Sequence, residues 1–240
     1  MAVAALGSIP DLFHRTDYLA KTYERSSSSL VPMTVFVPGG RFAVGGAWVD
    51  ERPVRVAEVR PLRFGLTPVS NAAWAGFLAT GEAEEPPWWR HPDFQDPEQP
   101  VVGVTWFESV AYCLWLHETI GGRWRLPTEA EWEHAAMLAT GEPEAGFAAD
   151  RPACLGQGVA NGFGLLDLGS SVHEWCHDWF APDLLHATRR YDPRGPELGE
   201  QRVRRGGSWR DPSRAVSWRD GFDPSARAVD GGFRVVREVP

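Results

Sequence analysis

The first part of the chain alternates apolar and polar residues in a way that predicts β-strands. From Met33 to Gly46 the sequence reads MTVFVPGGRFAVGG, with apolar residues on both sides of a Pro-Gly-Gly group. This pattern predicts a strand, a turn and a second strand. The next segment, RPVRVAEVRPLRFG (Arg52–Gly65), has regularly spaced valines, which is typical of a half-buried strand.

Three later segments have the spacing and the end signals of helices. Ser70 precedes a segment whose apolar residues share one helical face, and a glycine follows it, so a helix is predicted there. Thr105–Glu108 and Thr128–Glu131 both have the capping-box sequence, in which the first and fourth residues bond to each other's backbone. They predict two more helices, which run to His117 and Met137.

The remainder of the chain predicts loops and short strands. After Met137 it has many glycines, prolines and aspartates with isolated tryptophans, so buried indoles and side-chain-to-backbone bonds are expected to hold it together. No linker-like tract interrupts residues 32–240, which are predicted to form one domain. Residues 1–31 are predicted to be an N-terminal arm that is partly disordered, with a short helix near Asp17–Tyr23.

The composition and charge of the chain limit which partners and which cellular compartment are expected. The formal net charge is −8, and such a chain is repelled by phosphate backbones, so we expect no nucleic-acid binding, although Arg202, Arg204 and Arg205 cluster locally. No run of residues is long and apolar enough for a membrane span. Three cysteines without a Cys-x-x-Cys motif favour a reducing compartment. The N-terminus lacks the basic start of a signal peptide. A cytoplasmic location is predicted.

Five segments, in the same order along the chain, resemble the formylglycine-generating enzyme (sulfatase-modifying factor) family. They are FVPGGRFAVGG, LTPVSNAAWAGFL, PVVGVTWFESVAYCLWL with GGRWRLPTEAEWEHAA, NGFGLLDLGSSVHEWCHDWF, and RVRRGGSW with the later Gly-Phe-Arg. The resemblance covers about residues 33–237. It implies an α+β fold of the irregular, C-type-lectin-like kind with little regular secondary structure.

The resemblance also shows where this chain departs from the copper enzymes of the family. Formylglycine generators carry two copper-binding cysteines just after a Gly-Gly-Ser-aromatic motif, and soft thiolate ligands are what Cu(I) requires. Aligned on Gly206–Trp209, the two positions hold Asp211 and Val216. The chain is therefore predicted to be a paralogue without copper oxidase activity, and no copper is expected. A divergent formylglycine generator with other ligands stays open as an alternative.

A second branch of the family consists of iron-dependent sulfoxide synthases, which bind iron mainly through an additional helical domain. The thirty residues before this domain are too few for a four-helix bundle. Such an oxidoreductase would therefore need a separately encoded partner that binds the iron. The pocket candidates are Trp209, Asp211, Arg219 and Asp220. Their alternative roles are a core indole for Trp209 and an ion-pair cluster for the other three.

Calcium is the metal that the resemblance implies, in a structural role. Matched position by position, the ligands are the side chains of Asp167 and Glu174 and the backbone carbonyls of Ser170 and Val172, and hard cations favour such oxygen sets. The alternative is that Glu174 ties the loop together by accepting backbone N–H bonds. His173–His177 also matches the zinc-protease motif His-Glu-x-x-His, but its surroundings lack a helical period, and a packed or hydrogen-bonded His173 is expected.

Fold alone does not decide activity. The favoured function is the binding of a peptide, a small ligand or a protein partner without copper oxidation. The acidic segment Glu82–Pro100 contains Trp88 and Trp89, which would mark a ligand surface if exposed and would be structural if packed. The sequence leaves open the ligand, the oligomeric state and the roles of His173 and Asp211.

Overall fold

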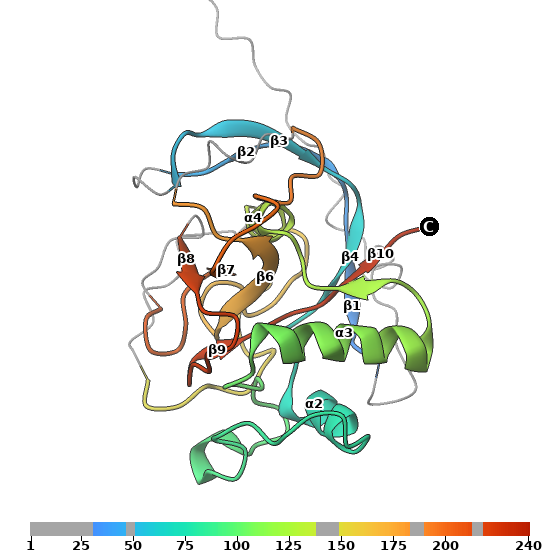
Figure 1. Cartoon of the computed structure of the whole chain (residues 1–240), viewed down its shortest axis with the longest axis vertical. Coiled ribbons are helices and arrows are strands. Elements are labelled where there is room, and N and C mark those ends of the chain that lie inside the picture. The colour runs from blue at the N-terminus through green and yellow to red at the C-terminus, as the bar shows by residue number, and fades with distance from the viewer. Residues whose placement is uncertain (1–30, 47–50, 138–148, 183–189, 213–217) are drawn as a thin grey trace, which may run out of the picture.

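The computed structural model describes residues 31–46, 51–137, 149–182, 190–212 and 218–240 (Figure 1). The predicted helix near Asp17–Tyr23 and most of the predicted arm lie outside these ranges. Within them the chain has the predicted mixture of short strands, a few helices and long irregular connections. No helix of the described part combines the length and the apolar character that crossing a bilayer requires.

The first sheet joins the two ends of the domain. It has the order β1-β4-β10-β5, in which β1 is Thr34–Val37, β4 is Leu62–Gly65, β10 is Val236–Glu238 and β5 is Trp124–Arg125. All neighbouring pairs in it are antiparallel. One face buries apolar side chains against Ala135. The segment Arg52–Gly65, predicted as one half-buried strand, forms two strands, Arg55–Val59 (β3) and β4, and they belong to different sheets.

The second sheet is a hairpin that begins after the Pro-Gly-Gly group. The strands predicted on either side of that group are both present, but they do not pair with each other, because the first belongs to the first sheet and the second to this hairpin. Strands β2 (Gly40–Val44) and β3 (Arg55–Val59) pair antiparallel and pack apolar residues against Ala130. A side chain at Gly39 would come within 2.5 Å of the backbone oxygen of Val59. Glycine is therefore required at Gly39 because the two backbones approach too closely for a Cβ atom.

The third sheet contains many charged and polar residues. Its order is β8-β7-β6-β9, with β6 at His173–Trp179, β7 at Arg202–Arg205, β8 at Arg219–Phe222 and β9 at Gly231–Gly232. The β6–β9 pair is parallel and the others are antiparallel. Because His173–His177 lies on a strand, it does not form the helix that a zinc-protease motif needs.

The three predicted helices are present with their predicted N-terminal caps. They are α2 (Asn71–Leu78), α3 (Trp106–Ile120) and α4 (Glu129–Ala136), and a short 3₁₀ turn, η2, covers Pro92–Phe94. Both capping boxes are formed in full. The helix α3 extends three residues past the predicted end, to Ile120, and Gly121 follows it with φ of +70°.

The core is built largely from aromatic rings. The largest cluster lies between α2 and α3, where Trp74, Phe77, Tyr112 and Phe233 contact one another edge-on or stacked. In Figure 1, α3 crosses the molecule with α2 on one side and the strands on the other. The helix α4 packs against the β2–β3 hairpin and against β6 and β7. Buried indoles thus replace long regular elements, as the sequence predicts.

Candidate functional site

The segment Gly206–Asp211, here called the glycine turn, follows directly after β7. Gly206 has φ of +78°, and a Cβ atom there would lie 3.0 Å from the Trp132 ring. The turn closes through two backbone bonds between Ser208 and Asp211, of 3.1 and 3.0 Å. The Ser208 hydroxyl also donates to Asp230 Oδ2 at 3.0 Å. Several hydrogen bonds therefore hold the turn, with Asp211 at its end and Asp230 bonded to Ser208.

His173 packs under this turn from β6. Its Nδ1 lies 2.7 Å from the carbonyl oxygen of Gly206, so Nδ1 carries the proton and donates. Its Nε2 then faces Asp230 Oδ2 at 3.8 Å, and its ring lies 4.8 Å from that of Trp218. Burial, with help from nearby Arg204, lowers the pKa of His173. At neutral pH the imidazole is therefore uncharged, and it is packed and hydrogen-bonded as expected.

Sequence reasoning did not find Asp230. It contacts Ser208 and His173, which are 22 and 57 residues away, so no local pattern joins them. The available signal was its position just before the Gly-Gly-Phe-Arg segment, whose two glycines form β9 beside β6. Together His173, Ser208 and Asp230 form a polar cluster that supports the glycine turn from below.

Two of the four pocket candidates meet at the glycine turn. Trp209 is 8% exposed and packs with Phe94, Val102 and Val172, so it has the role of a core indole. Asp211 is half-buried at the end of the turn. The structure thus puts one half-buried carboxylate at the end of the glycine turn.

The other two candidates, Arg219 and Asp220, lie on β8. Arg219 is buried and forms two hydrogen bonds to Glu129, of 2.6 and 2.8 Å, and a third to a backbone carbonyl. Asp220 is half-buried and pairs with Arg204 on the neighbouring strand. Both therefore take part in ion pairs, which was the alternative role considered for them.

Arg219 belongs to a buried charge network between α4 and the third sheet. Arg205 bonds Glu133 at 2.6 Å and Glu129 at 3.2 Å. Asp178 Oδ2 accepts from the backbone N–H of Glu129 at 2.9 Å. Burial, with the nearby Glu129 charge, raises the pKa of Asp178 to about 8. The network is structural in character, since its members are shielded from solvent and bonded to each other.

Of the four predicted calcium ligands, Glu174 has the most contacts. Its carboxylate accepts from Arg234 at both oxygens and from Trp132 Nε1 at 2.7 Å, and it is completely buried. A calcium ion would have to share these oxygens with a guanidinium group. Asp167 has φ of 59°, and its Oδ2 accepts from the backbone N–H of Gly156 at 2.6 Å.

The other two predicted ligands, Ser170 and Val172, contribute only backbone carbonyls. Across the described residues, no group of three or more acidic, histidine or cysteine side chains is placed to hold a metal ion. A site with two side chains and two carbonyls is not tested by that observation. The calcium site stays a prediction.

None of the three cysteines belongs to the glycine turn. Cys113 belongs to the aromatic cluster around α3, and Cys176 is buried with Trp132 and Val203. Burial raises the pKa of both thiols, so they stay protonated. Cys154 is half-buried near Asp96, and all three cysteines are free thiols.

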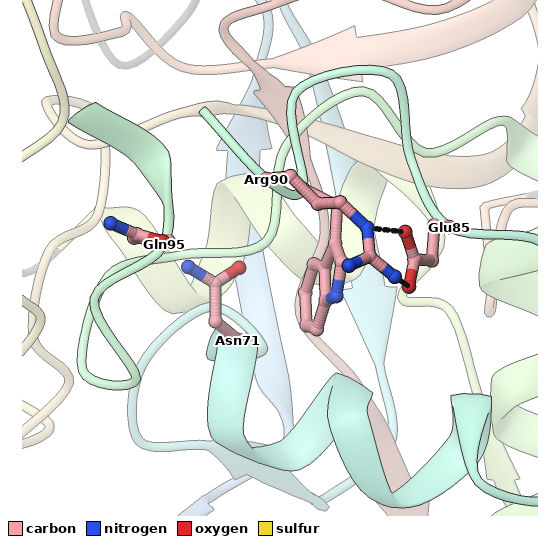
Figure 2. A pocket seen from close by; sticks show the side chains of 5 residues that line it. Asn71, Glu85, Arg90 and Gln95 are labelled. Carbon is pink, nitrogen blue, oxygen red and sulfur yellow. Dashed lines mark hydrogen bonds and ion pairs between the residues drawn. The ribbon is translucent and has the colours of Figure 1, made fainter. Parts of the chain in front are cut away.

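The acidic loop, Glu82–Pro100, packs against the glycine turn through Phe94, whose ring lies 6.0 Å from that of Trp209. Trp88 and Trp89 are both half-buried against core clusters, which favours their structural role. Beside Trp89 the loop and the start of α2 line an open cavity of about 390 Å³. Figure 2 shows a Glu85–Arg90 ion pair on one side of this cavity and Asn71 and Gln95 on the other.

Asn71 is held at the floor of this cavity in one orientation. Its amide nitrogen donates to the carbonyl oxygens of Phe94 and Asp96, at 2.8 and 2.9 Å. Only the amide nitrogen can donate to these two carbonyl oxygens, so the positions of Nδ2 and Oδ1 are fixed. Among the described residues nothing donates to that oxygen, so it is available to a ligand.

Comparison with known proteins places this geometry in a family. The sulfatase-modifying factor enzyme 1-like domain matches residues 20–239. The formylglycine-generating enzyme of Thermomonospora curvata is 31% identical, over 77% of this chain and 85% of that protein. The hercynine oxygenase of Mycolicibacterium smegmatis is 28% identical, over 86% of this chain and 61% of that protein.

Solved structures agree at the level of fold. PvdO from Pseudomonas aeruginosa superimposes with a TM-score of 0.77 at 23% identity, over 88% of this chain and 96% of that one. Treponema denticola variable protein 1 gives a TM-score of 0.76 at 22% identity, over 90% and 98%. The order of motifs, the α+β architecture and the family match lead to one conclusion: the chain belongs to the formylglycine-generating enzyme (sulfatase-modifying factor) family.

Proposed function

We propose that this family member binds a peptide or small ligand at the surface formed by the glycine turn and the acidic loop, and that it does not carry out copper-dependent oxidation. The observation that carries the proposal is Asp211. It ends the glycine turn at the position that the resemblance assigns to the first copper-binding cysteine, and no residue from Gly206 to Trp218 is a cysteine.

The chemistry of the available side chains supports the negative half of the proposal. A carboxylate is a hard ligand and does not select Cu(I), for which thiolates are the preferred protein donors. Cys113 and Cys176 are buried in separate clusters, and their raised pKa values keep them as thiols. A copper site at the turn would therefore need donors of an unusual type.

The charge of the acidic loop supports the positive half. The loop has six acidic residues and one arginine, a formal charge of −5 with His91 neutral. Its cavity offers the fixed oxygen of Asn71 and the indole of Trp89, while both carboxylate oxygens of Glu85 accept from Arg90, which also lines the cavity. The oxygen and the ring face attract cations and N–H donors. A basic side chain of a ligand would compete with Arg90 for Glu85. A peptide with a basic side chain is the ligand that this surface fits best.

One experiment tests both halves. A peptide of the form Cys-x-Pro-x-Arg is incubated with purified protein and Cu(I) and analysed by mass spectrometry, while its binding is measured by calorimetry without copper. We expect binding without the formylglycine mass shift. A mass shift that requires the protein would overturn the negative half, and the absence of binding to this and other basic peptides would overturn the positive half.

A second candidate function is an oxidoreductase that acts with a separately encoded iron-binding partner. The observation that favours it is the hercynine oxygenase relative, of which this chain spans only 61%. No cluster of metal-binding side chains occurs in the described ranges, so the iron would have to come from the partner. Iron analysis of the protein after co-purification with its binding partners tests this candidate. Iron that follows a histidine-containing partner would favour it.

A further inference from the structure

Three arginines of β7, Arg202, Arg204 and Arg205, cluster in the sequence, but the structure gives them different surroundings. Arg204 and Arg205 each pair with carboxylates from neighbouring elements. Arg202 makes one hydrogen bond to a backbone carbonyl and two ring contacts, and it forms no ion pair with any described residue. The fold therefore leaves one of the three charges without a counterion.

The guanidinium group of Arg202 is held between two indole rings. Its central carbon lies 3.4 Å from the centre of the Trp179 ring, which faces it across the β6–β7 pair. The same carbon lies 3.8 Å from the centre of the Trp106 ring, at the start of α3. A Cβ atom at Gly199 would lie 2.9 Å from the side chain of Trp179, so the loop before β7 packs directly on that residue. The stacking fixes the guanidinium plane, so little side-chain freedom remains to be lost when a ligand binds.

The three nitrogens of Arg202 differ in what they can reach. Nε is enclosed by protein, and Nη1 donates to the carbonyl oxygen of His177 at 2.5 Å. Nη2 has no hydrogen-bond partner among the described residues, and unlike Nε it is not enclosed, since the residue is only half-buried. Because rings cover both faces of the guanidinium, a ligand reaches the charge at the edge that carries Nη2.

The acidic residues near Arg202 do not neutralise it. Asp178 is the carboxyl that acts on it, but burial and the Glu129 charge raise the pKa of Asp178 to about 8, so it is uncharged at neutral pH. Glu197 and Glu200, on the loop before β7, are exposed and form no ion pair with a described residue. Burial lowers the pKa of Arg202 to about 10, which leaves it charged. Charges withdrawn from water are normally paired, and an anion from solution would supply the missing partner.

Two further groups that can bind an anion lie at the same end of the third sheet. The His177 imidazole is half-buried, and neither ring nitrogen has a hydrogen-bond partner in the described part of the chain. Arg194 is exposed and likewise has no ion pair there. The next residue, Gly195, packs against the end of β6, where a Cβ atom would lie 3.1 Å from the strand backbone. Burial lowers the pKa of His177, and the charges of Arg202, Arg125 and Arg194 lower it further, so these groups lie close together.

We propose that the open edge of Arg202, with His177 and Arg194 beside it, binds an oxyanion, the carboxylate or phosphate group of a small molecule. The oxyanion accepts hydrogen bonds from Nη2 of Arg202 and from the imidazole N–H of His177, while the Arg194 charge attracts it. The site lies at the opposite end of β6 from His173 and the glycine turn. It is separate from the acidic loop as well, so the inference does not depend on the proposed function.

The test uses acetate and inorganic phosphate as probes of the full chain. The NMR signals of the His177 ring report binding at neutral pH and constant ionic strength. Arg202→Met removes the charge but keeps an apolar chain between the indoles, and no carboxylate loses a partner, so this variant should fold. Arg194→Gln is a second variant, at an exposed position. The control is Arg123→Met, which removes an exposed arginine just beyond the other end of α3.

We expect at least one of the two anions to shift the His177 signals saturably. Its dissociation constant should be about tenfold higher or more in Arg202→Met, the loss expected for a hydrogen bond to a charged group. Arg194→Gln should raise it about two- to fivefold, and Arg123→Met less than twofold. The more tightly bound probe identifies the group as a carboxylate or a phosphate. No saturable shift with either probe, or equal affinity in wild type and Arg202→Met, would overturn the proposal.

Discussion

Arg234 and Glu174 form an ion pair in which both side chains are 0% exposed. Two bonds join them, from Nε to Oε2 at 2.7 Å and from Nη2 to Oε1 at 2.9 Å. The remaining guanidinium hydrogens go to backbone carbonyls of β4 and of the loop before β6, at Gly65, Leu66 and Leu166. One arginine in the Gly-Phe-Arg motif thus connects the first sheet to the third.

This pair predicts a large loss of stability when its arginine is removed. Arg234→Leu leaves the Glu174 carboxylate buried without its countercharge, and breaking a buried pair in this way costs about 3–5 kcal/mol. The matched control is Arg90→Leu, which removes an exposed arginine from its pair with Glu85 and should cost at most about 1 kcal/mol. Urea unfolding measures both. Similar losses for the two variants would contradict the assigned role of Arg234.

The calcium prediction gives a separate test on the same loop. If calcium binds through Asp167 and Glu174, adding it should raise the melting temperature and EDTA should lower it. Asp167→Ala should remove this response, whereas Asp150→Ala, at an exposed position, should keep it. A wild-type melting temperature that is the same in calcium and in EDTA would show that the Arg234–Glu174 pair stabilises the loop without a metal.

Local signals allowed the helices to be predicted well from the sequence. Thr105 and Thr128 each fix a helix start because the residues that bond there are only three positions apart. The end of α3 was placed three residues early, since Ile120 still packs against the core and Gly121 provides the stop. Interactions between residues only a few positions apart can be predicted from the sequence alone.

Partners distant in sequence made the site less predictable. Arg219 was considered a pocket residue, but its ion-pair partner Glu129 lies 90 positions earlier, on α4. Asp230 was missed because it reaches Ser208 only after β8 and the loop that follows bring the chain back to the turn, just before β9. β9 itself consists of two glycines, and no apolar pattern marks such a strand. The sequence shows that Arg219 and Asp230 carry charges, but their burial and their partners depend on the fold.

The proposed ligand surface predicts a difference between two neighbouring glutamates. Glu85→Gln removes a carboxylate that lines the acidic-loop cavity and pairs with Arg90, whereas Glu84→Gln removes the same charge outside that lining. Both glutamates are exposed. The affinity for a basic peptide should fall about three- to tenfold for Glu85→Gln and less than twofold for Glu84→Gln, because contact pairs outweigh screened charges. Calorimetry measures both. Equal losses would mean that only the overall charge of the loop matters.

The proposal that the chain lacks a copper site predicts what two added cysteines would do. Asp211→Cys combined with Val216→Cys supplies two thiols at the positions that the resemblance assigns to the copper-binding cysteines, and thiolates bind Cu(I) strongly. The double variant should take about one equivalent of Cu(I) from a competing chelator, while either single variant and the wild type should take much less. The chelator's absorbance provides the measurement. Equal uptake by the wild type would show that other donors in the chain already bind copper.

Asp178 makes the stability of the fold depend on pH. Its carboxyl holds a proton up to about pH 8 when folded, because burial and the Glu129 charge oppose ionisation. The unfolded chain releases this proton near pH 4. Between these values the folded state binds more protons than the unfolded state, so stability falls as pH rises, by up to about 1.4 kcal/mol per pH unit, and stays low above pH 8.

The variant Asp178→Asn tests this dependence because its amide oxygen can still accept from the backbone N–H of Glu129, yet it cannot ionise. It should equal the wild type near pH 4 and become steadily more stable than it from pH 5 to 8. Urea unfolding at each pH gives the difference. The control is Asp223→Asn: the Ser225 hydroxyl lowers the pKa of exposed Asp223, so its carboxyl is ionised above pH 5 in both states and the difference from wild type should not change with pH. A constant difference for Asp178→Asn as well would mean that Asp178 is ionised in the folded protein, with Arg219 or Arg205 compensating its charge.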